Sequence, residues 1–146
     1  MSYGIKAYKS VGIKDDLAVA DPHRIIQLLM QGSLENMAKA KGAMERKDFA
    51  EKSRTVSKAM SIISALQHSL DMDVGGEVSQ NLWSLYDFMV NHLMQASRES
   101  NPAKVDDVID IMIKIKSGWD AIPVEDRQKG FQLLAERQGQ AALASA

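Results

Sequence analysis

The stretch Asn81–Ala96 constrains the fold of this chain more than any other part of the sequence. It contains no glycine or proline, so nothing in it interrupts a helix. At 100° per residue its apolar side chains form two neighbouring stripes: Leu82, Leu85, Met89, Leu93 and Ala96, with Val78 one turn earlier, and Trp83, Tyr86, Val90 and Met94. Together the stripes cover about half of the circumference, whereas an average surface helix buries roughly 100°. This helix therefore needs to be covered from two directions.

Local signals predict three further helices around it. Asp21-Pro22 and Asn101-Pro102 each place a capping side chain before a proline at the first helical position. Asp48 resembles the start of a capping box, because Glu51 follows three residues later. Gly75-Gly76 marks the turn before the central helix. The predicted helices therefore span about 22–46, 49–70, 77–100 and 102–122.

Each of the three other predicted helices carries one apolar stripe that would face a shared core. The stripes are Ile25, Ile26, Leu29, Met37, Ala40 and Met44; then Phe49, Val56, Met60, Ile63, Leu66 and Leu70; and finally Val105, Val108, Ile109, Met112, Ile115 and Trp119.

Four amphipathic helices joined by short links predict an all-α fold, an antiparallel up-down four-helix bundle. At 146 residues the chain is expected to hold one domain, over 1–123. Residues 1–20 have two glycines and no sustained period, which indicates a mobile N-terminal arm that docks on the bundle. Val124–Ala146 forms a C-terminal tail, for which a short fifth helix and a frayed end both stay open.

Composition excludes several function classes. The net charge of −1 argues against nucleic acid or an anionic membrane as a partner held by bulk electrostatics. The absence of cysteine excludes disulfides and thiolate sites and suits a reducing compartment. No stretch has the apolar length of a secretory signal or a membrane span. A cytoplasmic protein without direct membrane insertion is the expectation.

No catalytic constellation is visible. The three histidines, His23, His68 and His92, are separated in sequence and are expected to be surface or first-turn residues. Neither Glu-x-x-His pairs, a His-Glu-x-x-His motif nor a phosphate-binding glycine loop occurs. The sequence therefore predicts no enzyme, with no catalytic, cofactor-binding or metal-binding residues.

The high methionine content is the positive signal for function. Nine methionines are present, and this flexible side chain adapts to irregular apolar partners, although most of those on the main stripes are expected to fill the core. Trp83, Val90 and Met94 lie off the main stripe of their helix. Two interpretations are evenly balanced: extra neighbours within the chain, including the N-terminal arm, or a surface for a partner helix. An interaction protein and a self-associating structural bundle both survive, with a cofactor-binding bundle a distant third.

Several motifs, in order, resemble the flagellar secretion chaperones of the FliS family over roughly Ser2–Ile122. They are Gly4-Ile5-Lys6-Ala7-Tyr8, the run from Asp21 to Leu29, the run from Lys58 to Ile63, Leu70-Asp71 ahead of Gly75-Gly76, the run from Leu85 to Val90, and Trp119. The resemblance does not extend through Val124–Ala146.

The resemblance implies a cytoplasmic chaperone for the C-terminal segment of flagellin, which is disordered in the monomer. Such a chaperone prevents premature polymerisation and delivers flagellin to the flagellar type III export apparatus. It also implies that Ile5 and Tyr8 contact the export-gate protein. We expect Trp83, Tyr86, Val90 and Met94 to bind the client, in exchange with the N-terminal arm. The alternatives are a structural or self-associating bundle, such as a homodimer, or a chaperone for a different secreted client.

Overall fold

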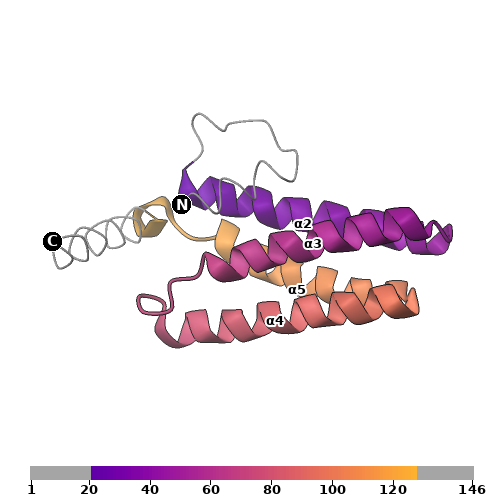
Figure 1. Cartoon of the computed structure of the whole chain (residues 1–146). Coiled ribbons are helices and arrows are strands. Elements are labelled where there is room, and N and C mark those ends of the chain that lie inside the picture. Colours follow the sequence, from indigo (N-terminus) through magenta and orange to yellow (C-terminus); the bar gives the residue numbers. More distant parts are fainter. Residues whose placement is uncertain (1–20, 128–146) are drawn as a thin grey trace, which may run out of the picture.

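The computed structural model describes residues 21–127, and over this range the chain is a bundle of four long helices. These are α2 (Pro22–Glu45), α3 (Phe49–His68), α4 (Gly76–Glu99) and α5 (Pro102–Asp120); residues 124–127 are also helical. Figure 1 shows the four helices lying side by side, with α2 and α4 each packed against both α3 and α5. The predicted all-α four-helix bundle is confirmed. The N-terminal arm with Ile5 and Tyr8, and the tail beyond residue 127, lie outside the described residues.

The predicted helix starts are present. In each, a side-chain oxygen accepts a backbone N–H from the first turn: Asp21 from Arg24 at 2.8 Å, Asp48 from Glu51 at 3.1 Å, and Asn101 from Ala103 at 3.1 Å. These bonds satisfy N–H groups that have no partner within the helix. Glu51 does not complete a capping box, because its carboxylate forms an ion pair with Arg54 at 2.5 Å.

The two ends of α4 have specific features that fix the links to its neighbouring helices. Gly76, at the start of α4, has a φ of +53°, a left-handed conformation that favours glycine. At the other end of α4, the Lys52 ammonium from α3 donates to the Ser97 carbonyl at 2.9 Å and to the Ser100 hydroxyl at 2.8 Å. A cation on terminal carbonyls also suits the negative end of the helix dipole. Turns of this length bring successive helices back antiparallel.

All four helices contribute to one core. Its completely buried large side chains are Leu29, Met30, Met37, Ile62, Ile63, Leu66, Met89, Leu93, Val105, Val108 and Met112. The methionines assigned to the main stripes of α2, α4 and α5 are buried in it, whereas Met60 of α3 is only partly buried against this core. The apolar stripes thus correctly predict the centre of the bundle.

The stripes fail at their ends. Phe49, placed on the stripe of α3, is 58% exposed, and Val78, placed on that of α4, is 67% exposed. Both lie in the first turn of their helix, where fewer side chains from neighbouring helices reach them. The Phe49 ring instead lies 5.1 Å from the Lys52 ammonium, a cation–π contact.

His23 lies in the first turn of α2, as expected, but it is not at the surface, because its side chain is 3% exposed. The imidazole stacks on Trp119 at 4.8 Å between ring centroids, and its Nε2 donates to the Trp119 carbonyl at 2.8 Å. In return, the Trp119 indole N–H donates to the His23 carbonyl at 3.0 Å. Beside this pair, Gln27 donates to Asp120 at 2.8 Å. These contacts, here called the α2–α5 clasp, join the start of α2 to the end of α5.

Candidate functional site

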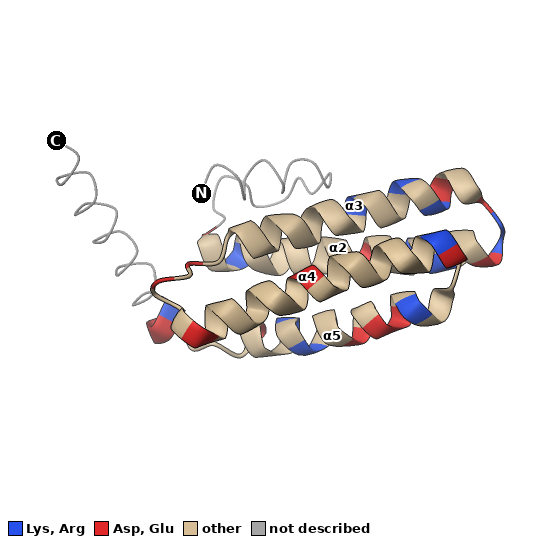
Figure 2. Cartoon of the chain, turned by 60° about the horizontal axis from the view of Figure 1, so that its bottom comes forward, with Lys and Arg blue, Asp and Glu red and all other residues tan. Residues whose placement is uncertain are grey.

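Helix α4 is almost free of charge along its length. Between Glu77 and Arg98, Asp87 is the one residue that is Asp, Glu, Lys or Arg. Figure 2 accordingly shows most of α4 in tan, the colour of residues without charge of these types. The outward surface of α4 carries neutral polar side chains that are exposed: Gln80, Asn81, Ser84, Asn91 and Gln95. Depletion of charge is typical of the centre of protein–protein interfaces. We therefore take the exposed side of α4 as the candidate functional site.

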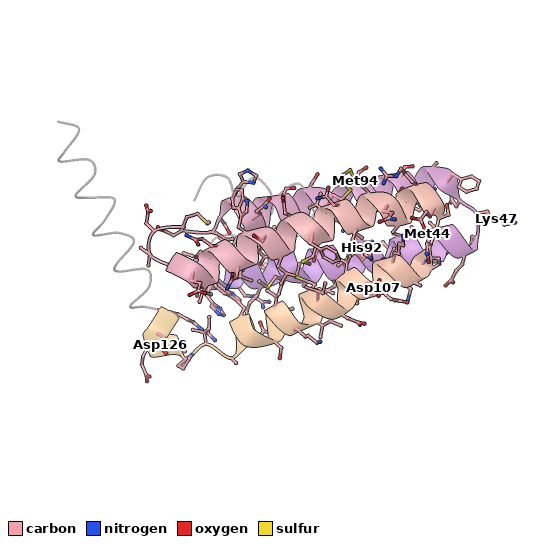
Figure 3. All side chains as sticks on the ribbon, turned by 90° about the horizontal axis from the view of Figure 1, so that it is seen from below. Met44, Lys47, His92, Met94, Asp107 and Asp126 are labelled. Atoms are coloured by element: carbon pink, nitrogen blue, oxygen red, sulfur yellow. The ribbon has the colours of Figure 1, made fainter. Side chains whose placement is uncertain are left out.

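One edge of this surface is a regular line of side chains, here called the α4 seam: Trp83, Asp87, Val90 and Met94. Their spacings of four, three and four residues place them on one side of the helix. Trp83 and Val90 are partly buried, whereas Asp87 is exposed and Met94 is 39% exposed. Figure 3 shows Met94 on the side of α4 that faces α3. Three of the four predicted client-binding residues therefore lie together at the surface.

Helix α3 holds the seam in place through a buried amide. Gln67, 5% exposed, donates to the Trp83 carbonyl at 3.0 Å and to a carboxylate oxygen of Asp87 at 3.2 Å. The His68 ring meets Trp83 edge-on, with 5.4 Å between ring centroids. These contacts restrict the side chains of Trp83 and Asp87.

Tyr86, the fourth predicted client-binding residue, occupies a different place. It is 2% exposed and belongs to the core cluster, in contact range of the fully buried side chains around it. Contact of Tyr86 with a client stays a prediction; in the folded bundle the residue packs inside, beneath the surface of α4. Burial raises the pKa of its phenol to about 12, because the phenolate would lose its water.

This shift predicts a loss of stability in alkali. Above pH ~10 the unfolded chain releases the Tyr86 proton while the folded chain keeps it, so stability falls between pH ~10 and ~12. The expected contribution of Tyr86 to this fall is about 2–3 kcal/mol. Urea unfolding of the wild type and of Tyr86→Phe across this range measures it, since the variant lacks the titrating group. Identical pH profiles for the two proteins would contradict the burial of this phenol.

The opposite edge of α4 faces α5 and carries an aromatic residue that the sequence patterns missed. Phe88 is 49% exposed, and its ring stacks on His92 at 5.0 Å between centroids. The Nε2 of His92 lies 2.9 Å from a carboxylate oxygen of Asp107 on α5. Figure 3 shows the two labelled residues near each other. Phe88 lies outside both apolar stripes. A large aromatic residue on a helix face that is otherwise expected to be polar is the sequence feature that could have indicated it.

Two further observations concern metal binding and membrane insertion. Over residues 21–127, no set of three or more His, Cys, Asp or Glu side chains is arranged to hold a metal ion. None of the helices described is long and apolar enough to span a bilayer.

Known proteins resemble this chain over most of its length. The model of the family described as flagellar protein FliS matches residues 4–126. The flagellar secretion chaperone FliS of Vibrio cholerae is 42% identical over 125 residues, which cover 86% of this chain and 92% of the relative. FliSB of Pseudomonas aeruginosa, also named a flagellar secretion chaperone, is 43% identical over 118 residues, covering 81% and 94%. FliS of Salmonella typhimurium is 33% identical over 120 residues, covering 82% and 89%.

Proposed function

The chain belongs to the FliS family of flagellar secretion chaperones, and on this premise we propose that it binds the C-terminal segment of flagellin in the cytoplasm. By holding that segment it prevents premature polymerisation, and it delivers flagellin to the export-gate protein of the flagellar type III apparatus. The proposed role is that of a carrier and not of an enzyme, in keeping with the chaperone names of the relatives.

The observation that carries this proposal is the exposed side of α4. It combines neutral polar groups with partly exposed large side chains on both edges, Trp83 and Met94 towards α3 and Phe88 towards α5. An amphipathic segment that folds on binding can lay its apolar face on such a surface. Burial of that face offsets the entropy lost when a disordered segment becomes ordered. Because part of the binding free energy is used in this way, the net affinity stays low enough for release.

The contact with the export gate rests on the resemblance alone. It assigns Ile5 and Tyr8 to that contact, and both lie outside the described residues. The two assignments therefore stand as predictions that are independent of the α4 surface.

Truncation of the client tests the proposed function. The purified chain, mixed with the flagellin of the same organism, should form a complex on size-exclusion chromatography that disappears when flagellin lacks its C-terminal segment. The chaperone run alone provides the control, since a self-associating bundle would elute as an oligomer without any client. Failure to bind intact flagellin, or equal binding to both forms of flagellin, would contradict the proposal.

A further inference from the structure

We propose that Asp87 selects and aligns the client by pairing with a lysine or arginine on the client's apolar face. This inference rests on the proposed function and specifies the chemistry of the segment that the α4 seam accepts. The partner is an amphipathic helical segment whose apolar stripe is interrupted by one basic residue.

Asp87 lies within the seam, between apolar side chains. The spacing of Trp83, Asp87, Val90 and Met94 is the one that packs a second helix along a seam, and Asp87 is its single charged member. In packed helices, one polar residue in an apolar seam fixes the register, because sliding by one turn places it against an apolar side chain. Asp87 has the position required for this role.

Covering the Asp87 carboxylate with a client costs free energy unless the charge is paired. A client helix on the seam removes water from Asp87, which is exposed in the free chain. A charge buried without a partner strongly opposes binding, whereas a paired charge does not. No lysine or arginine lies between residues 78 and 97 of α4, and none of the ion pairs within residues 21–127 involves Asp87. A client that supplies a cation is therefore favoured, and segments without one bind more weakly.

The Asp87 carboxylate is already oriented in the free chain. The buried Gln67 amide donates to one oxygen of Asp87 at 3.2 Å and is itself held by the Trp83 carbonyl at 3.0 Å. A side chain fixed in this way loses less entropy when it pairs with a cation than a free surface aspartate does. Gln67 thus acts as a positioning residue for the pair.

Binding of a synthetic flagellin C-terminal peptide to the full chain, measured by titration calorimetry, tests the inference. Asp87→Asn should weaken binding about tenfold and reduce its dependence on salt, because one charge pair is lost. Asp110→Asn is the matched control, since it removes the same charge from an exposed position on α5 and should leave both quantities unchanged.

A charge exchange identifies the partner residue. Each lysine and arginine of the peptide is changed in turn to glutamate, and each peptide is titrated against the wild type and Asp87→Lys. One peptide should bind Asp87→Lys at least about tenfold more tightly than the unmodified peptide does, which is the signature of direct coupling.

The outcomes distinguish the proposed function from the inference about Asp87. If the wild-type chain does not bind the unmodified peptide, both are wrong. If the wild type binds but Asp87→Asn binds equally well with the same salt dependence, only the inference is wrong. The inference is also wrong if no exchanged peptide recovers binding to Asp87→Lys.

Discussion

Replacing Trp119 by alanine should lower the free energy of unfolding by about 3 kcal/mol. This value is at the low end of the range for removing a packed tryptophan, because the Trp119 side chain is only partly buried. The substitution removes the stacking on His23 at 4.8 Å and the indole bond to the His23 carbonyl at 3.0 Å. It also uncovers an imidazole that is 3% exposed in the wild type. Urea unfolding followed by far-ultraviolet circular dichroism measures the change.

Trp119→Phe is the control that separates packing from hydrogen bonding. Phenylalanine keeps a ring against His23 but loses the N–H donor, so we expect a smaller loss of about 1 kcal/mol. If Trp119→Ala lowered the free energy of unfolding by less than about 1 kcal/mol, the α2–α5 clasp would not be needed to close the bundle. Packing elsewhere in the core would then have to hold α5 in place.

The clasp also shows which features could be predicted from the sequence. The starts at Asp21 and Asn101 were predictable because a cap and a proline are local signals, complete within a few residues. The contact of His23 with Trp119 joins residues 96 apart, and no pattern within one helix contains it. Burial of a histidine next to a cap therefore depends on which distant helix end lies beside it.

The α4 surface shows a similar limit. Periodicity predicted correctly that the apolar arc of α4 is wider than one core stripe, but it could not locate the boundary between core and surface within that arc. Tyr86 and Met94 were grouped on one stripe although they lie roughly 80° apart on a helical wheel. In the bundle, Tyr86 is 2% exposed and Met94 is 39% exposed. The positions of α3 and α5 set that boundary, and these are tertiary features.

Phe88 was missed for a related reason. An exposed aromatic side chain breaks the apolar pattern of its helix, so a search for periodic stripes discards it. Here it is 49% exposed and stacks on His92, which is held by Asp107 of α5. Exposed residues need not follow the period of the chain's own core, and for this reason the pattern predicted the bundle better than the surface.

Met94→Lys should reduce the affinity for the flagellin C-terminal peptide at least about tenfold, the largest effect that we expect from one surface substitution. Met94 is the most exposed apolar side chain of the α4 seam, and a lysine there places a hydrated charge where the client's apolar face would lie. The free energy of unfolding should change by less than about 0.5 kcal/mol, because Met94 is not among the side chains of the core cluster or those packed against it. Substitution of Val90 would be less informative, since that residue packs against the core.

The matched control is Ile113→Lys, which introduces the same charge at an apolar side chain of α5 that is 51% exposed. Titration calorimetry with the peptide should show unchanged affinity for this variant, and Met94→Leu should also bind as the wild type does because it keeps an apolar side chain of similar size. Equal losses for Met94→Lys and Ile113→Lys would indicate a general charge effect and not a docking surface. An undiminished affinity of Met94→Lys would place the client elsewhere on the bundle, because a lysine cannot lie within a dry apolar contact without cost.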